Sequence, residues 1–309
     1  EGFLPQMGSR ADLHVHTKYS GLARLGFLRF PESVSEPRDV VKQANRKGLS
    51  VVCVTDHNTI RGGVLAKDHA KEFPGTEVVI GEEISTLDGE LIGLYLNETV
   101  PKDLSAAESV DRIRAQGGIT VAPHPFSAHV PGLGSRVDLL NLDALEVLNG
   151  GHVDGYANDK AAEHARSGRW ATVGGSDSHS LPPIGCSYTE FDGQGAEGLR
   201  KSVLNKSTKA GGSPMPIGLH VAWSVEVAFA SDRLLIGSLL GRNVEVDEYD
   251  VTMKKVRDIG TGKKILAIAG SIVFFVPPIP YLVGIIGQRR IRMMNSGPMH
   301  EEDSRKRLI

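Results

Sequence analysis

Cysteine is scarce in this chain of 309 residues, which contains two, Cys53 and Cys186. Two cysteines cannot form the disulfide framework that stabilises many small secreted proteins. Cys53 lies within the apolar run 51–54, where a small buried thiol is the ordinary expectation. Residues 1–10, which we treat as an N-terminal extension, contain no apolar stretch of the kind that a secretory signal peptide needs. We therefore expect a protein of a reducing compartment.

An excess of charge of either sign is also missing. The net charge is −2 at pH 7 and the isoelectric point is near 6.7, whereas proteins that bind the phosphates of nucleic acids usually carry a strongly basic surface. The composition therefore gives no strong signal for nucleic-acid binding. The length is sufficient for one large α/β domain and an appendage.

Short apolar runs alternate with helical patterns between residues 11 and 212. This alternation predicts a parallel sheet, open or closed into a barrel. Ser105, with Glu108 three residues later, is typical of a helix start, and Gly48 and Gly117 are typical of helix ends. The predicted strands cover 11–16, 50–55, 77–81, 91–96, 119–123, 143–148 and 171–175. The predicted helices cover 37–47, 62–73, 105–117, 156–167 and 195–206.

The first predicted strand carries His14 and His16. Residues two apart on a strand face the same side, so both imidazoles can point at one metal ion. Asp12 lies on the same face, where a carboxylate could orient a ligating histidine. A His-x-His pair also occurs by chance on solvated strands, so its meaning depends on the rest of the chain.

Similar residues follow the other predicted strands, although each of them could also simply cap its strand. The segments are Thr55-Asp56-His57-Asn58, Gly81-Glu82-Glu83, Pro123-His124-Pro125, Glu146 to Asn149, and Ser176-Asp177-Ser178-His179. In a barrel of alternating strands and helices, catalytic residues lie at the carboxyl ends of the strands. Five of the 11 histidines stand at such ends, with carboxylates between them. This convergence is typical of a site with more than one metal ion.

Five of these segments, taken in order, resemble the motifs of the PHP superfamily (polymerase and histidinol phosphatase domain). They are Asp-Leu-His-Val-His-Thr, Thr-Asp-His-Asn, Gly-Glu-Glu-Ile-Ser, Pro-His-Pro and Ser-Asp-Ser-His. The resemblance covers residues 11–212. It implies a distorted (β/α)7 barrel, similar to a TIM barrel, that binds two or three divalent metal ions (Mn, Zn, Fe or Mg) and hydrolyses phosphate esters.

The resemblance also implies a role for each ligand. His14 and His16 match the first metal pair, which Asp177 completes, and Glu83 matches the bridging carboxylate. His124 matches a ligand of the second ion. His57 and His179 match ligands of the third ion.

Two departures from the family pattern bear on the metal count. Many relatives read His-x-Leu-Gly after the bridging glutamate, and this chain has Glu90 at the histidine position. A carboxylate is a competent ligand that would favour Mn or Mg; alternatively, Glu90 only ends a turn. Relatives often carry Ser-Asp-Gly after the first histidine pair, with the aspartate on the third ion, whereas Ser20-Gly21-Leu22 has no acid. Both a two-metal and a three-metal site remain open.

The chemistry that we expect is attack on phosphorus by a metal-bridged hydroxide, from a metal-bound water held by Glu83 and Asp177. Lys18, Arg61 and Arg136 each follow a ligand-bearing strand and are candidate contacts to the substrate phosphate, although solvated basic residues are common in loops.

A phosphorylated small molecule or a nucleotide is the substrate that the resemblance implies. The alternatives are an exonuclease or phosphodiesterase acting on short nucleic-acid ends, and a membrane-bound binding module that has lost catalysis.

The insertion between Gly21 and Pro37 is unusually apolar for a loop and predicts either a lid or a packing cluster.

The last hundred residues differ from the rest. We predict a linker and amphipathic region over 213–264, a hydrophobic membrane segment over 265–287 and a charged tail over 288–309. The segment 265–287 has no formal charge and is long enough to span a bilayer. Prolines 277, 278 and 280 should kink or break a helix there, so a re-entrant hairpin, a kinked span and a buried core segment all remain open. The expected location is at a membrane, with the barrel in the cytoplasm.

Overall fold

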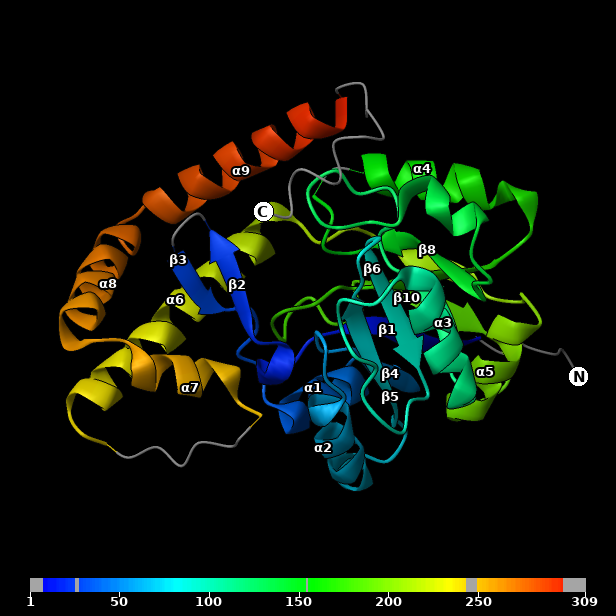
Figure 1. Ribbon diagram of the computed structural model, residues 1–309, viewed down its shortest axis with the longest axis horizontal. Helices are drawn as coiled ribbons and strands as arrows, with labels where there is room; N and C mark the ends of the chain where they lie inside the picture. Colours follow the sequence, from blue (N-terminus) through cyan, green and yellow to red (C-terminus); the bar gives the residue numbers. More distant parts are fainter. Residues whose placement is uncertain (1–7, 26–27, 154, 243–248, 297–309) are drawn as a thin grey trace, which may run out of the picture.

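The computed structural model describes residues 8–25, 28–153, 155–242 and 249–296. Figure 1 shows two parts, a barrel-like α/β body and a group of helices on one side of it. The body ends with the strand Lys209–Gly212, close to the predicted boundary at residue 212. The first strand begins at Ser9, two residues earlier than predicted.

One sheet of nine strands forms the body among the described residues. The strands are β1 (Ser9–Val15), β4 (Val51–Val54), β5 (Glu77–Ser85), β6 (Glu90–Leu94), β7 (Ile119–Ala122), β8 (Ala144–Asn149), β9 (Ala171–Gly175), β10 (Ser187–Phe191) and β11 (Lys209–Gly212). Their order is β11-β10-β1-β4-β5-β6-β7-β8-β9. Because β9 also packs against β1, β10 and β11, the sheet is nearly closed. All seven predicted strands are confirmed, whereas β10 and β11 were not predicted.

The sheet is not purely parallel, which corrects the expected (β/α)7 alternation. Strand β6 runs antiparallel to both β5 and β7, and β10 runs antiparallel to both β1 and β11. Four residues separate β5 from β6, and a connection so short can join only antiparallel strands. The barrel-like fold is therefore confirmed in outline, with two reversed strands.

Five α-helices accompany these strands in the described part of the barrel, and all five were predicted. They are α1 (Pro37–Arg46), α2 (Arg61–His69), α3 (Ala106–Ala115), α4 (Tyr156–His164) and α5 (Gly195–Leu204). Ser105 caps α3 by accepting a hydrogen bond from the amide of Glu108 at 3.2 Å. Apolar side chains of the strands pack against these helices; Leu145, for example, is fully buried.

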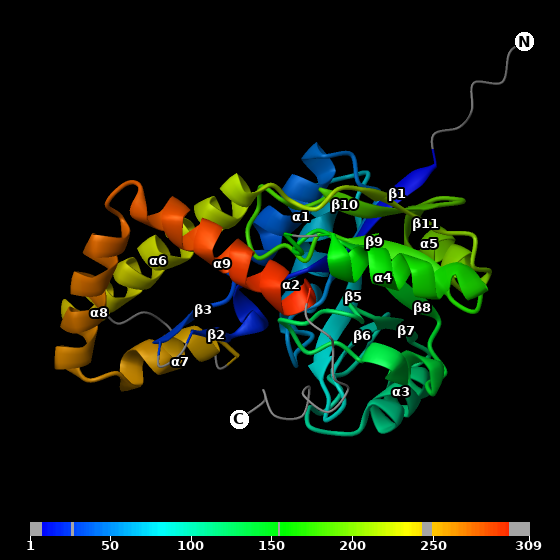
Figure 2. The ribbon, with the colours of Figure 1, turned by 90° about the horizontal axis from the view of Figure 1, so that it is seen from above.

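The apolar insertion after Gly21 forms a hairpin of its own. Its strands are β2 (Leu22–Leu25) and β3 (Leu28–Pro31), which pair only with each other in the described part of the chain. The hairpin lies beside the C-terminal helices (Figures 1 and 2). It therefore packs against the part of the chain farthest from it in sequence.

The C-terminal region is helical. Its helices are α6 (Ile217–Leu239), α7 (Val251–Asp258), α8 (Thr261–Phe274) and α9 (Ile279–Ser296). Helix α6 packs against β3, α7, α8 and α9, and Gln288 of α9 donates a hydrogen bond to the carbonyl of Val153 in the barrel at 3.2 Å.

The helices of this region do not coincide with the predicted segments. The predicted linker and amphipathic region 213–264 contains α6, α7 and the start of α8, and its residues 243–248 lie outside the described residues. The predicted segment 265–287 is divided between α8 and α9 by a break at the prolines. The predicted tail from residue 288 continues α9 to Ser296, and residues 297–309 lie outside the described part.

None of the described helices is by itself long and apolar enough to cross a membrane. Helices α8 and α9 meet those criteria only as a pair, with an 88° bend between them.

Candidate metal centre

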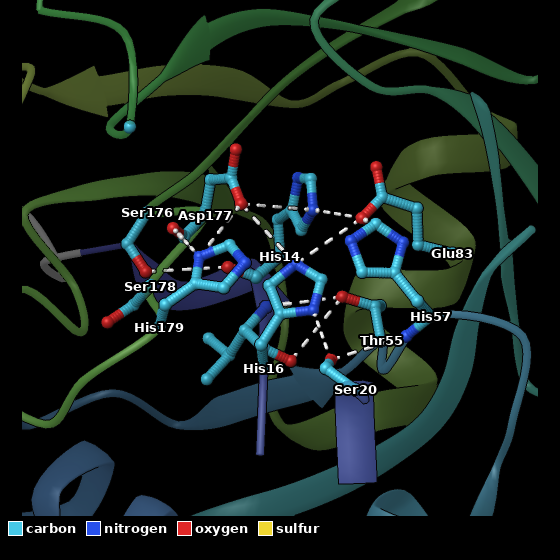
Figure 3. A network of polar contacts seen from close by, with 12 residues as sticks. His14, His16, Ser20, Thr55, His57, Glu83, Ser176, Asp177, Ser178 and His179 are labelled. Carbon is cyan, nitrogen blue, oxygen red and sulfur yellow. Dashed lines mark hydrogen bonds and ion pairs between the residues drawn. The ribbon is translucent and has the colours of Figure 1, made fainter. Parts of the chain in front are cut away.

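The eight predicted ligands converge at one end of the barrel, although they come from distant parts of the sequence. They are His14 in β1, His16 just after it, His57 after β4, Glu83 in β5, Glu90 in β6, His124 after β7, and Asp177 and His179 after β9. Figure 3 shows six of them around a common centre. The sheet brings them together because β1, β4, β5, β7 and β9 point in the same direction.

Glu83 is the centre of this cluster. One of its oxygens lies 3.1 Å from Nε2 of His14 and 3.3 Å from Nε2 of His16. The other oxygen lies 3.1 Å from Nε2 of His124. The Glu83 side chain is almost fully buried. A carboxylate that faces imidazoles with both oxygens is placed to bridge two ions, which is the role that the resemblance implied.

Asp177 faces the same histidine pair from the opposite side. Its Oδ1 lies 3.5 Å from Nε2 of His14 and 3.3 Å from Nε2 of His16. Both Asp177 and His124 have positive φ, 50° and 29°. Non-glycine residues in such conformations are uncommon and concentrate at functional sites. The backbone therefore turns at these two residues so that their side chains face the centre.

The four groups around the first position have the spacing of ligands that share an ion. Zinc–nitrogen and zinc–oxygen bonds of about 2.0–2.1 Å in a tetrahedron put neighbouring ligand atoms about 3.3–3.4 Å apart. The distances among His14, His16, Glu83 and Asp177 given above lie between 3.1 and 3.5 Å. Nε2 of His16 is buried and makes no hydrogen bond within the described residues. An orphaned imidazole nitrogen between two carboxylates fits a divalent ion.

Glu90 lies at the second position, beside Glu83. Its oxygens are 3.8 Å from Nε2 of His124 and 3.8 Å from Nδ1 of His57. Burial and the nearby charge of Glu83 raise the pKa of Glu90 to about 7. Glu90 thus faces the centre from β6 instead of only ending a turn. Whether it binds a metal stays a prediction.

The buried ionisable groups stabilise one another's charged forms. Burial opposes ionisation of Glu83 and Asp177, but positive charge on His14 and on the other imidazoles outweighs burial and holds both pKa values well below the usual range. Burial likewise opposes protonation of His14, but Asp177, Glu83 and Glu146 raise its pKa well above the ordinary value. A metal cation that replaced the imidazole protons would also stabilise the charged forms of Glu83 and Asp177.

Glu146 in β8 supports the ligands from behind. Its Oε1 lies 3.2 Å from Nδ1 of His14, and its Oε2 accepts hydrogen bonds from the amide of His124 and from Asn149 at 2.8 and 2.9 Å. A carboxylate behind a ligating imidazole fixes its orientation. That role was expected of Asp12, but the hydrogen bonds that Asp12 accepts come from the backbone amides of His14, Ser176 and Gly185.

Glu32 is a residue that the sequence did not predict for the site. It follows the β2–β3 hairpin, and its carboxylate lies 3.4 Å from Nε2 of His57 and 3.6 Å from Nε2 of His179. Burial opposes ionisation of Glu32, but the charges and hydrogen bonds of His57 and His179 lower its pKa. The only signal in the sequence is an acidic residue that ends an apolar insertion.

The three basic residues predicted to bind phosphate have other contacts. Lys18 lies 3.0 Å from Glu36, and Arg136 lies 3.5 Å from Asp88. The guanidinium of Arg61 lies over the ring of Tyr249, 5.2 Å from its centre. None of these partners belongs to the ligand cluster, and a role in substrate binding stays a prediction.

Comparison with known proteins agrees with the geometry. Residues 12–106 match the model of the PHP domain, and residues 155–208 match the model of a PHP-associated region. The first range contains His14, His16, His57, Glu83 and Glu90, and the second contains Asp177 and His179.

Relatives and one solved structure add to this result. An uncharacterised protein of Methanocaldococcus jannaschii is 55% identical over 152 residues, which are 49% of this chain and 88% of the relative. A 5'-3' exoribonuclease of Haemophilus influenzae is 30% identical over 129 residues, 40% of this chain and 43% of the relative. A two-domain protein of Bacteroides vulgatus, described as containing a predicted PHP-like metal-dependent phosphoesterase, has a similar fold, with a TM-score of 0.53 at 18% identity over 66% of this chain and 65% of that one. With both family models matched and a relative that is 55% identical over 88% of its own length, the chain belongs to the PHP domain family.

Proposed function

We propose that this protein hydrolyses phosphate esters in a metal-dependent reaction at the end of the barrel, and that its substrate is a phosphomonoester or a nucleotide. The observation that carries the proposal is the convergence of His14, His16, Glu83 and Asp177 at ligand spacing, 3.1–3.5 Å. Family membership supports the same chemistry.

The residues of the cluster would have different roles in this reaction. When bound, divalent ions activate a water molecule and neutralise the oxygens of the phosphoryl group. Glu83 and Asp177 would hold those ions as carboxylates. Both side chains are ionised because the surrounding imidazoles keep the pKa values of the two carboxyls low. Glu146 would keep the ring of His14 in one orientation through the 3.2 Å contact to Nδ1. Burial of the cluster keeps competing water away from these groups.

Two substitutions test the catalytic role. Wild-type protein, the double variant H14A/H16A and H69A are loaded with Mn²⁺, and phosphate release from p-nitrophenyl phosphate and from nucleoside monophosphates is measured. His69 is a partly exposed residue at the end of α2 that pairs with Glu72, so H69A is a matched control. We expect wild-type turnover in H69A and a loss of at least about 10³-fold in the double variant, because removing the groups that hold the reacting centre removes most of the stabilisation of the transition state. Activity retained in folded H14A/H16A would contradict the metal assignment.

A second candidate is hydrolysis at nucleic-acid ends. The relative named as a 5'-3' exoribonuclease favours it, although the chain spans 43% of that protein. The same assay separates the two candidates when 5'-labelled RNA is added as a substrate. Release of mononucleotides from RNA at a higher kcat/KM than release of phosphate from nucleoside monophosphates would select the exonuclease.

We propose further that helices α8 and α9 lie against a membrane surface. Their exposed apolar side chains, among them Leu266, Ile272 and Ile286, support this, as do the neighbouring basic residues Lys263 and Arg289.

The test of this membrane proposal is sedimentation of the full chain with vesicles of phosphatidylcholine and phosphatidylglycerol. We expect L266E/I286E to bind several-fold more weakly than wild type, and L87E, altered on an exposed residue of the barrel, to bind as wild type does. Equal binding by all three proteins, or binding by none, would contradict the proposal.

A further inference from the structure

The far side of the histidine cluster has no acidic ligand in the sequence motif, yet the structure places one there. The carboxylate of Glu32, which follows the β2–β3 hairpin, faces both His57 and His179. Its Oε2 lies 3.4 Å from Nε2 of His57, and its Oε1 lies 3.6 Å from Nε2 of His179. The ring of His16 stacks between those of His57 and His179, with centroids 4.9 and 4.2 Å away. The three histidines also have ring nitrogens close enough together to bind one ion.

We propose that Glu32 completes a third metal position with His57 and His179, supplying from the hairpin the carboxylate that is missing after Ser20. The inference rests on the proposed metal-dependent function. Two imidazole nitrogens and a carboxylate are a donor set that suits Zn²⁺ and Mn²⁺.

The distances separate this reading from a plain ion pair. Charge-assisted hydrogen bonds between an imidazolium and a carboxylate are about 2.7–2.9 Å long. The separations at Glu32 are longer, 3.4 Å from Oε2 to Nε2 of His57 and 3.6 Å from Oε1 to Nε2 of His179. Both lie near the 3.3–3.4 Å or so between neighbouring ligand atoms of a tetrahedral ion. Each Glu32 oxygen is thus spaced from one histidine as a fellow ligand atom is, which fits a carboxylate that binds through both oxygens.

The backbone of Glu32 is held on several sides, so its position does not depend on the histidines alone. Its amide donates to the carbonyl of Gly21 at 3.0 Å, and its carbonyl accepts from Nε1 of Trp223 in α6 at 3.1 Å. The next residue, Ser33, donates its hydroxyl to the carbonyl of His16 at 3.3 Å.

Helix α6 therefore takes part in the site. Besides its hydrogen bond to Glu32, Trp223 places its ring edge-on to His179, with centroids 5.9 Å apart. Thr252 of α7 also lies 3.4 Å from the carbonyl of Gly21, at the base of the hairpin. The C-terminal helices thus position a ligand that the barrel motifs do not supply.

Metal counting on the full chain tests the proposal. Wild type, E32Q and E36Q are stripped with chelator, dialysed against a small excess of Zn²⁺, desalted, and analysed for bound zinc per chain by elemental mass spectrometry. E36Q is the matched control, because Glu36 lies four residues away, is exposed and pairs with Lys18. We expect three ions in wild type and E36Q, and two in E32Q, whose amide keeps the shape of the side chain without its charge. The two remaining ions would report that the rest of the centre is folded.

The outcomes separate this inference from the proposed function. Equal counts of two or three ions in wild type and E32Q would overturn the third position and leave the proposed function intact. No retained ions in wild type would contradict both.

A further variant, W223F, tests the role of α6. It keeps an aromatic ring but removes the hydrogen bond to Glu32. We expect the third zinc ion to bind several-fold more weakly, with the first two unchanged. If W223F bound the third zinc ion with the affinity of wild type, α6 would have no role in positioning Glu32.

Discussion

The barrel buries ionisable side chains, whereas the C-terminal helices expose apolar ones. Asp12, His14, Glu83 and His124 are all less than 5% exposed inside the barrel. On α8, by contrast, Leu266 is 73% exposed. Burying a charge raises the free energy of the folded protein unless an opposite charge or a metal ion lies beside it. Removing apolar surface from water lowers the free energy. The proposals for the two regions follow from this difference: metal ions would neutralise the charge buried in the barrel, and a membrane surface would cover the apolar side chains of the helices.

The largest expected difference between the two regions is in how much a leucine side chain contributes to stability. We expect L145A, in the fully buried core of the barrel, to lower the free energy of unfolding by about 2–5 kcal/mol, because it leaves a cavity. The same substitution at Leu266 should change it by less than about 0.5 kcal/mol, because a side chain exposed to this extent loses little packing. Urea denaturation of both variants measures the difference. A loss at Leu266 as large as that at Leu145 would mean that α8 is packed as tightly as the barrel.

A second test concerns the protons that metal ions must replace. In the metal-free barrel, burial opposes protonation of His124, but its contact with Glu83 outweighs burial and raises its pKa to about 9. His124 is therefore protonated at pH 7, and a metal ion must displace that proton.

We therefore expect metal uptake at pH 7 to release protons and the apparent affinity to rise as the pH increases toward 9. Calorimetric titration with Mn²⁺ in two buffers of different ionisation enthalpy measures the release. Equal heats in both buffers at pH 7 would show that the ligands are already deprotonated.

The smallest expected effect concerns Glu82, a buried carboxyl that faces away from the ligand cluster. Burial raises its pKa to about 8, although Oε2 accepts a hydrogen bond from the amide of Val100 at 2.8 Å. A carboxyl whose pKa is higher in the folded state stabilises the fold fully only below its unfolded pKa of about 4.5. This stabilisation is lost as the pH rises through about 8.

Substitution of Glu82 by glutamine should remove this loss, because the amide stays neutral. We expect the Tm of E82Q to exceed that of wild type by a few degrees above pH 8 and to approach it near pH 4.5. E98Q, altered at an exposed position, should follow wild type throughout. A constant difference between E82Q and wild type across this pH range would rule out titration of Glu82 as the cause.

Local patterns were sufficient to predict most elements of the barrel and the convergence of the eight candidate ligands. The alternation of apolar strands with helices predicted the five helices and seven of the nine strands that the structure describes in the barrel. His14 and His16 were predictable because a strand has a period of two residues. The others were predictable because parallel strands carry their carboxyl ends to one edge of the sheet. These rules need only the order of residues along the chain.

The tertiary structure decided three other features. They are the reversal of β6 and β10, the positions of Glu32, Glu146 and Trp223 beside the histidines, and the packing of α6 on the hairpin. Each depends on which segments meet across a large sequence separation. The residue numbers of Glu32 and Trp223 differ by 191, and those of His14 and Glu146 differ by 132. A hairpin inside an insertion has no periodic link to the sheet, so its position follows from side-chain packing against α6. The sequence by itself determined which residues could bind metal ions, and packing between distant segments decided how many of them surround the centre.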